Sequence, residues 1–514
     1  MKRNDVGWII GLACALHAPS WFRPFMDIDE GSYAGIACRL LDGGTVYRDG
    51  VENKFPGIFY VYKAVFAVFG RYNMVAIHAA VTLAAIATAL VVGAIARRYA
   101  AENAANRAER WAAALYVVFS AAYYPKMLAG NTEMFAVLPA AVTVWCYLRA
   151  PGCGARGAVW YLAAGAFGAV ALLGKQVALA TFAAVLADRA LSPRGFPRAK
   201  EARGPYPALD PSPSVSGLRE PLRALRDLAL LAIGFAGVVI AMVMHLQRVG
   251  AWDDAVFWTW TYVLHYYMPS GTADHGFAFN LATSFLPFLI TLGPLIYLAY
   301  RGKGRAQSAL YWWLAGNVCA GLVGGRMYGH YFLLFVPALA TLAGIGAARW
   351  LDDAHRRERR YLIALVAAVA VAFFGVATMY EGATGSAFTP SPDYREASAY
   401  VRARTAPGDQ IFVWGWFPAL YQAADRCPST RFVYTHIMSG ANASGAERNH
   451  NVPEAWDMLM RDLKRAPPAY ILDTSPGDYN FSFPPERYPH LWAFIAARYR
   501  VETTIAGVRL FRRT

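Results

Sequence analysis

Long apolar stretches alternate with short polar segments along the first three quarters of the chain. A bilayer-spanning helix needs about 20 mostly apolar residues, and stretches of roughly 15 to 25 such residues recur here. They cover residues 6–22, 73–96, 111–127, 132–148, 158–174, 176–190, 227–247, 279–300, 308–325, 329–349 and 361–381. The pattern predicts a polytopic α-helical membrane protein with about 11 transmembrane helices.

A further apolar stretch, residues 57–70, is shorter and carries Lys63. Its length and its charge are typical of a helix that lies in the membrane interface rather than crossing the bilayer. We therefore predict an interfacial helix over 57–70. Counting it as a span would invert the orientation of every later segment.

Composition and charge support this reading. Of 514 residues, 57% are hydrophobic and 16% are charged, which is outside the range of ordinary soluble proteins. A net charge of +15 would suggest nucleic acid for a soluble chain, but basic residues of membrane proteins mark cytoplasmic loops. With the N-terminus inside, the inside segments hold 24 Lys and Arg residues and the outside segments before residue 382 hold 10. This asymmetry predicts that the loop 23–56 and the C-terminal segment 382–514 lie outside, and no nucleic-acid partner is expected.

After residue 381 the pattern changes to short strands and amphipathic helices. Strands are predicted at 410–414, 431–434 and 469–473, with a hairpin over 499–511 that turns at Ala506-Gly507, and helices at 393–405, 418–424, 453–465 and 488–497. Strands that alternate with helices predict a small α/β domain. The chain therefore divides into a transmembrane domain, 1–381, and an extracytoplasmic α/β domain, 382–514.

The six cysteines are scattered and show neither a metal-binding spacing nor a disulfide framework. Cys38 and Cys427 are both predicted outside, so a bridge between them is conceivable. We favour the simpler interpretation, that the cysteines are small apolar residues.

Charged residues gather at the outside ends of the predicted spans. Carboxylates there could act as a general base, and Lys, Arg and His could hold a phosphate, which suits group transfer from a lipid phosphate. The candidates are Asp27, Asp29, Glu30 and Lys54 in the loop 23–56, Glu133 at the start of a span, and Lys175, Arg326 and His330 at later outside ends.

Several short motifs in these segments resemble one family. They are Asp29-Glu30-Gly-Ser-Tyr33-Ala, Gly43-Gly-Thr-Val-Tyr47-Arg-Asp49, Lys54-Phe-Pro56-Gly, Asn131-Thr-Glu133-Met-Phe and Gly329-His330-Tyr331. In this order they resemble the glycosyltransferase C superfamily, in particular the bacterial branch that resembles protein O-mannosyltransferases and the lipid A aminoarabinose transferase. The chain has Lys-Phe-Pro where many relatives have Lys-Pro-Pro or His-Pro-Pro.

The resemblance implies a sugar donor linked to polyprenyl phosphate, a periplasmic acceptor (an envelope glycan, a lipid or a protein) and inversion at the anomeric carbon. It implies a multi-pass protein of the bacterial inner membrane with its active site in the periplasm. By position, Asp29 is the catalytic base, Glu30 organises the site or binds an ion, and Glu133 is the acidic residue of the second loop. Lys54 contacts the donor phosphate, and Lys175, Arg326 and His330 are further phosphate ligands.

No cofactor is expected. The side chains of Asp27, Asp29 and Glu30 could ligate a divalent cation, because hard cations prefer oxygen ligands. The resembling branch does not uniformly need a metal ion, so none is predicted.

Each of these residues has a structural alternative. Asp29, Glu30 and Glu133 could cap helices, because acidic side chains favour helix N-termini. Lys54 could anchor the chain among lipid headgroups. Lys175, between two apolar runs, is costly unless it reaches an aqueous cavity, and Arg326 and His330 could be ordinary residues at span ends.

Two other functional classes remain open. A transporter or a flippase for lipid-linked sugars would place ionisable residues near mid-span and often shows repeated halves, neither of which is evident in this sequence. A sensor or scaffold would depend on the C-terminal domain. Charges gathered at the outside ends favour the enzyme.

Overall fold

The computed structural model describes residues 3–121, 127–151, 156–191, 219–267, 276–304, 307–325, 327–353, 357–358, 360–368, 371–372, 394–440, 452–477 and 483–514. The chain divides into two compact units. Unit 1 comprises Met1–Pro19, His78–Met244 and His275–Val376, and unit 2 comprises Ser20–Ile77, His245–Asp274 and Ala377–Thr514.

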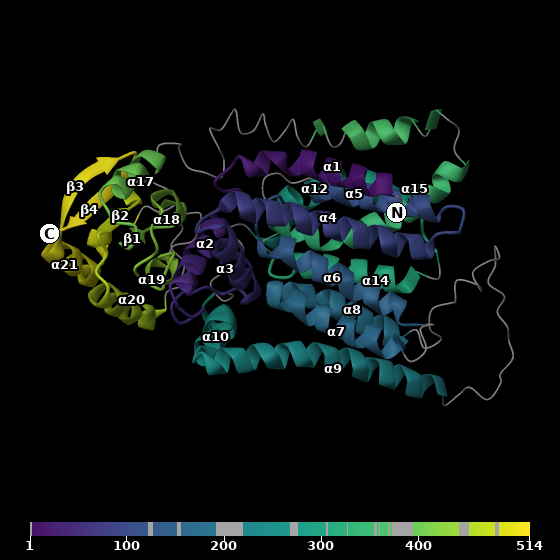
Figure 1. The fold of residues 1–514 in the computed structure, drawn as a ribbon, viewed down its shortest axis with the longest axis horizontal. Helices are drawn as coiled ribbons and strands as arrows, with labels where there is room; N and C mark the ends of the chain where they lie inside the picture. The colour runs from purple at the N-terminus through teal and green to yellow at the C-terminus, as the bar shows by residue number, and fades with distance from the viewer. Residues whose placement is uncertain are drawn as a thin grey trace. The chain divides into compact units, whose positions relative to one another are not determined.

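Unit 1 is built of helices. They are α1 (Arg3–Trp21), α4 (Met74–Tyr99), α5 (Ala105–Ser120), α6 (Thr132–Arg149), α7 (Gly157–Gly174), η2 (Gln176–Ala178), α8 (Leu179–Leu191), α9 (Arg219–Arg248), α11 (Phe277–Asn280), η5 (Leu281–Phe285), α12 (Leu286–Thr291), α13 (Gly293–Arg301), α14 (Ser308–Leu322), η7 (Gly329–Phe335) and α15 (Val336–Asp353) (Figure 1). The first residues of α4 and the ends of α1 and α9 belong to unit 2.

Every predicted span before residue 361 overlaps a helix or a broken series of helices, and the last predicted span lies partly outside the described residues. By length and hydropathy, 4 helices in the described part of the chain could cross a membrane, or up to 5 if the bent series Phe277–Arg301 is one span. The protein is thus a polytopic helical membrane protein, and the number 11 stays a prediction.

Small residues let the helices of unit 1 approach closely. Gly165 of α7 faces the backbone of Leu231 in α9, and Gly234 of α9 faces the backbone of Leu162 in α7, so a Cβ atom at either glycine would collide with the other helix. Close backbone approach through glycine is typical of membrane helices, where packing rather than water drives association.

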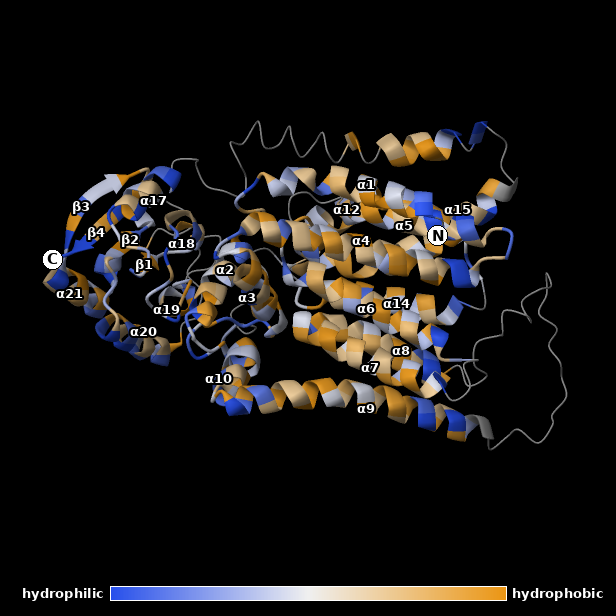
Figure 2. Ribbon diagram, in the orientation of Figure 1, coloured by the Kyte–Doolittle hydropathy of each residue, from blue (hydrophilic) through white to orange (hydrophobic). Residues whose placement is uncertain are grey.

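The polar ends of these helices lie together. Figure 2 shows apolar helix bodies in unit 1 and hydrophilic residues at the end that carries the N-terminus. Two ion pairs join neighbouring helices there, Arg97 with Glu109 at 2.9 Å and Arg189 with Asp227 at 2.9 Å. Arg97 and Glu109 belong to a segment that the charge pattern places inside, and Arg189 and Asp227 lie at the ends of the two predicted spans that flank another such segment.

Unit 2 combines the first loop with the C-terminal segment. Its helices are α2 (Ile28–Leu41), α3 (Gly57–Phe69), α10 (Trp252–Val256), the π-helical turns η3 (Phe257–Thr261) and η4 (Val263–Tyr267), α17 (Tyr394–Ala403), α18 (Ala419–Ala424), α19 (His436–Ser439), α20 (Pro453–Arg465), η8 (Ser475–Gly477), η9 (Pro485–Arg487) and α21 (Pro489–Arg498). At 13 residues, α3 is about 20 Å long and too short for a bilayer core of about 30 Å. Its place in the interface and the domain limits 1–381 and 382–514 remain predictions.

The C-terminal segment contains a sheet of four strands. The strands β1 (Ile411–Trp414), β2 (Tyr470–Asp473), β3 (Tyr499–Ile505) and β4 (Val508–Arg513) have the order β1-β2-β4-β3, with β1 and β2 parallel and the other pairs antiparallel. The predicted hairpin is confirmed, because Ala506 and Gly507 have positive φ angles of 50° and 75° between β3 and β4.

The predicted strand 431–434 is wrong. This segment contains bends and belongs to no sheet, and its backbone and side chains contact α2 and the first loop instead. The carbonyl of Arg431 accepts a hydrogen bond from the backbone N–H of Val51 at 2.9 Å, and Val433 packs against Gly35. The apolar pattern indicated burial correctly, but the partner is a helix.

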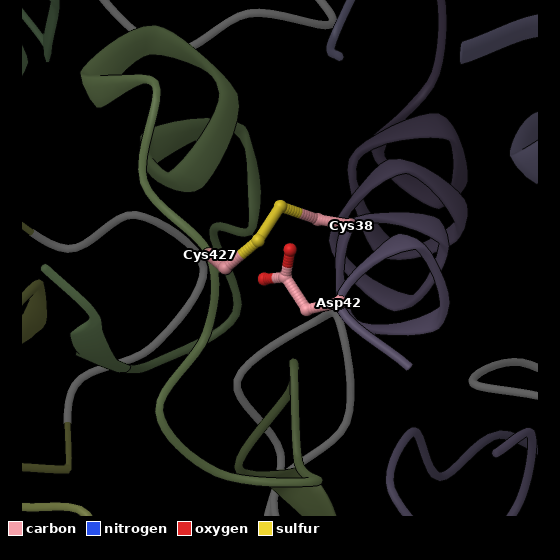
Figure 3. Close-up of side chains that lie close together, drawn as sticks. All are labelled: Cys38, Asp42 and Cys427. Atoms are coloured by element: carbon pink, nitrogen blue, oxygen red, sulfur yellow. A yellow bond between two sulfur atoms is a disulfide. The ribbon is translucent and has the colours of Figure 1, made fainter. Parts of the chain in front are cut away.

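The preferred interpretation of the cysteines is also wrong for one pair. Cys38 in α2 and Cys427 after α18 form a disulfide across 389 residues of sequence (Figure 3). Both ends lie in unit 2. The bridge joins the first loop covalently to the C-terminal segment.

Candidate active site

Helix α2 begins within the acidic run 27–30, and the Glu30 carboxylate helps to cap its N-terminus. Asp27 is the N-cap residue, and Oε2 of Glu30 accepts hydrogen bonds from the backbone N–H groups of Met26 at 2.6 Å and Asp27 at 3.4 Å. This is the reciprocal arrangement of a capping box. The Glu30 side chain is therefore buried and supports the start of the helix, which is the structural alternative that its sequence position allowed.

Asp29 lies one residue before Glu30, and its carboxylate faces other partners. The Tyr33 hydroxyl, one turn later, donates to Oδ2 at 3.3 Å, and the Lys54 ammonium lies 3.5 Å from the same oxygen. The other oxygen, Oδ1, accepts a hydrogen bond from the Tyr434 hydroxyl at 3.3 Å. A quarter of the Asp29 side chain remains exposed, so a substrate can reach it.

Lys54 is placed between two carboxylates. Its Nζ lies 3.5 Å from Asp29 and 3.4 Å from Oε1 of Glu52, and 5.5 Å from the centre of the Tyr33 ring. The Ser32 hydroxyl donates to Glu52 at 3.2 Å. The ammonium group thus offsets the negative charge of two neighbouring acids.

The turn before Lys54 fixes its backbone. Tyr47 has a positive φ of 69°, which is uncommon for a residue with a side chain, and its hydroxyl donates to the carbonyl oxygen of Lys54 at 2.8 Å. The buried Tyr47 ring packs edge-on against Phe59. Such local backbone strain persists only where the surrounding structure holds it.

Sequence reasoning missed Tyr434, Glu52 and Ser32 in this cluster. Tyr434 lies in a segment predicted to be a strand, 405 residues from Asp29, so no local spacing connects the two. Glu52 is one of several charged residues of the loop 23–56 and belongs to none of the motifs. Its position two residues before Lys54 was the available signal.

A pocket opens beside this cluster. Its walls include Glu52, Asn53, Trp258, Tyr434 and His436. All of these residues belong to unit 2. Glu52 and Tyr434, which contact Lys54 and Asp29, therefore border this pocket.

Unit 1 holds a second cluster, at the helix ends opposite the basic end. Glu133, in the first turn of α6, forms a buried ion pair of 2.8 Å with Lys175, which follows the last residue of α7. The Thr132 hydroxyl donates to Glu133 at 2.8 Å, and Nε2 of His330 lies 3.9 Å from its carboxylate. Lys175 also lies 4.6 Å from the centre of the Tyr331 ring.

The predicted site residues thus form two groups. Asp29, Glu30 and Lys54 lie together in unit 2, and Glu133, Lys175 and His330 lie together in unit 1. Arg326 lies outside the described residues. The catalytic and phosphate-binding roles of all seven remain predictions.

One group in the described part of the chain has the spacing of metal ligands, Cys38, Asp42 and Cys427. Figure 3 shows that the two sulfur atoms are bonded to each other, which leaves Asp42 as the one remaining donor. Asp42 is paired with Arg71, whose guanidinium also donates to the sulfur of Cys427 at 3.2 Å. This group is a disulfide beside an ion pair and does not fit a metal ion.

Comparison with known proteins gives a consistent picture. Residues 53–206 match the family model described as dolichyl-phosphate-mannose-protein mannosyltransferase, a segment that contains Lys54, Glu133 and Lys175. No curated protein matches the chain at a significant level of sequence similarity.

Solved structures match over nearly the whole chain. The crystal structure of ArnT from Cupriavidus metallidurans bound to undecaprenyl phosphate aligns with a TM-score of 0.60 at 14% identity, covering 98% of each chain. The apo state of the same protein aligns with a TM-score of 0.60 at 15% identity, covering 98% of this chain and 97% of that one. The oligosaccharyltransferase AglB from Archaeoglobus fulgidus, in complex with an inhibitory peptide and a dolichol-phosphate, aligns with a TM-score of 0.53 at 12% identity, covering 99% and 74%.

At these identities the structural matches establish the fold. Together with the family match, they confirm the resemblance that the motifs of the first loop indicated. The chain has the fold of the glycosyltransferase C superfamily and resembles ArnT and the O-mannosyltransferases.

Proposed function

We propose that the protein transfers a sugar from a polyprenyl-phosphate donor to an acceptor on the periplasmic face of the bacterial inner membrane, with inversion at the anomeric carbon. The observation that carries this proposal is the environment of Asp29, a partly exposed carboxylate beside a lysine and two tyrosines in a chain of this fold. The similar ArnT is bound to undecaprenyl phosphate and the similar AglB to a dolichol-phosphate, which supports a polyprenyl-phosphate donor.

In the proposed reaction, Asp29 removes the proton from an acceptor hydroxyl. The hydroxyl oxygen forms a bond to the anomeric carbon while the bond from that carbon to the phosphate oxygen breaks, and the electron pair leaves with the phosphate. A single displacement inverts the anomeric carbon. One carboxylate as base and a separate cationic site for phosphate suit this reaction better than two carboxylates alone, which are typical of hydrolases.

Lys54 has a double role in this proposal. Its ammonium pairs with Asp29 and Glu52. Because the Lys54 ammonium contacts Asp29, a donor phosphate that binds this ammonium would lie close to the proposed base. Lys54 would in this way bring the donor phosphate and the base together.

The second cluster supplies further phosphate ligands. Lys175 and His330 flank Glu133, which holds them at the helix ends opposite the basic end of unit 1. Buried charges in membrane segments are costly and usually serve function. We assign donor-phosphate binding to Lys175 and His330, to Arg326 on sequence grounds alone, and an organising role to Glu133.

Two independent observations support the periplasmic orientation. The basic residues favour an inside location for the loops at the other ends of the predicted spans, which leaves the loop 23–56 outside. The disulfide between Cys38 and Cys427 needs an oxidising compartment, and both cysteines fall in segments that the charge pattern places outside.

The test is a transfer assay with purified protein, radiolabelled polyprenyl-phosphate sugars and envelope acceptors. Asp29→Asn should lower kcat by about 10²- to 10⁴-fold, the usual contribution of a general base. The control is Asp253→Asn, which changes an exposed carboxylate of α10 in the same unit and should leave kcat unchanged. Full activity of Asp29→Asn would overturn the assignment of the base.

A further inference from the structure

The C-terminal segment contributes a hydroxyl to the cluster around Asp29. Tyr434 lies between β1 and α19 in sequence, and its hydroxyl is 3.3 Å from Oδ1 of Asp29 and 3.3 Å from the carbonyl oxygen of Ile28. The two acceptors belong to adjacent residues of the first turn of α2. A single phenolic proton is thus directed at the start of this helix.

Aromatic neighbours hold the Tyr434 ring in place. It stacks on Trp416 with ring centres 4.9 Å apart and planes inclined by 24°, and the His436 ring lies 5.7 Å away. Only 5% of the residue is exposed. The hydroxyl therefore reaches Asp29 from a packed aromatic group rather than from a mobile side chain.

Toward the Asp29 carboxylate, the phenol is the donor. Burial, and next the negative charge of Asp29, raise the pKa of Tyr434 well above its ordinary value. The hydroxyl consequently keeps its proton at any physiological pH. A neutral donor that faces one carboxylate oxygen stabilises the ionised form of that carboxylate.

The two oxygens of Asp29 then have different surroundings. Oδ2 faces the Tyr33 hydroxyl and the Lys54 ammonium, whereas Oδ1 faces Tyr434, which also lines the pocket with Glu52 and Asn53. We propose that Tyr434 is a positioning residue for the predicted base, holding the Asp29 carboxylate by its Oδ1 oxygen in the orientation in which it takes the acceptor proton. The C-terminal segment is then part of the reaction centre. This inference rests on the proposed function.

The experiment compares Tyr434→Phe with wild type in the full-length, membrane-embedded protein. The variant keeps the stacking ring and loses the hydroxyl, so the fold should survive. We expect kcat to fall about 10- to 100-fold, as for a lost hydrogen bond to a charged group. The KM for a polyprenyl-phosphate sugar should stay unchanged, because the hydroxyl contacts Asp29 rather than Lys54.

The pH profile separates positioning from a purely structural role. Losing a donor to the ionised carboxylate raises the pKa of that carboxylate. The acid limb of the kcat/KM profile should therefore move to higher pH in Tyr434→Phe. A variant that merely loosened the fold would lose thermal stability without moving this limb.

The matched control is Tyr470→Phe. Tyr470 in β2 also donates to a carboxylate, Glu502 at 2.5 Å, within the sheet of the same segment. The proposal is overturned if Tyr434→Phe has the kcat and the acid limb of Tyr470→Phe. If Asp29→Asn is inactive while Tyr434→Phe behaves as wild type, this inference fails and the proposed function stands. If Asp29→Asn retains full transfer, the assigned base and this inference fail together.

Discussion

Neighbouring acidic residues of one short run have different surroundings. The Glu30 carboxylate turns back to the backbone at the start of α2, whereas the Asp29 carboxylate points to Tyr33, Lys54 and Tyr434. The sequence could rank Asp29 first because the motif marks it, but it could not separate capping from chemistry. The two roles depend on the direction in which each side chain leaves the first turn of α2.

The ion pair of Glu133 and Lys175 gives a prediction at the scale of single residues. Breaking a buried pair by changing one partner to Met should destabilise the protein by about 3–5 kcal/mol, because the other charge stays buried without its partner. Replacing both by Met should restore stability, since an apolar pair of similar volume is usually tolerated. Melting temperatures in detergent measure this.

The same variants show whether the pair of Glu133 and Lys175 has a structural or a functional role. If Glu133 and Lys175 serve donor binding, the double variant melts like wild type but transfers less than about a tenth as much sugar, because loss of a charged contact costs at least tenfold. Recovery of transfer together with stability would show that the pair only holds α6 against α7.

At the scale of elements, helix α2 depends on partners far away in sequence. Cys38 is bonded to Cys427, and the Arg39 guanidinium donates to the carbonyl of Pro428 at 2.8 Å. Gly35 packs against Val433, and Gly31 against the backbone at Pro418 and Ala419. The helix itself was predictable from its apolar residues, but its neighbours were not, because contacts across about four hundred residues leave no local pattern.

Removing the disulfide tests how much it contributes to the stability of unit 2. Cys38→Ala combined with Cys427→Ala should destabilise unit 2 by about 2–4 kcal/mol, because a cross-link limits the freedom of the unfolded chain. Reducing agent should lower the melting temperature of wild type and leave that of the double variant unchanged. The control is Cys319→Ala, a free exposed cysteine of α14. Equal melting of wild type with and without reducing agent would contradict a stabilising bridge.

At the scale of the whole molecule, the sequence predicted most helices and the hairpin of the C-terminal segment. Apolar length and the Ala506-Gly507 turn are local signals, so they could be read directly. The grouping of the first loop with the C-terminal segment in unit 2 could not, because it arises from tertiary contacts such as the one between Val51 and Arg431.

The predicted orientation is testable across the whole chain. In a background without the free cysteines, Arg500→Cys in β3 should react with a membrane-impermeant maleimide from the periplasmic side. Glu102→Cys, between α4 and α5, should react only after the membrane is disrupted. Both positions are exposed, so access depends on their side of the membrane. Labelling of Glu102→Cys in intact cells would contradict the predicted topology.

The disulfide also sets the order in which the protein can mature. Its two cysteines are 389 residues apart, and Cys427 is synthesised after all the predicted spans. In the proposed orientation, Cys38 therefore has no Cys427 to bond while the predicted spans are inserted into the membrane, and the bridge would form only after Cys427 has been exported. A stalled or shortened chain would carry an unpaired thiol beside its acidic run, open to wrong pairing with other exported proteins. In that orientation, completion of the molecule would depend on the oxidising machinery of the compartment that receives its last segment.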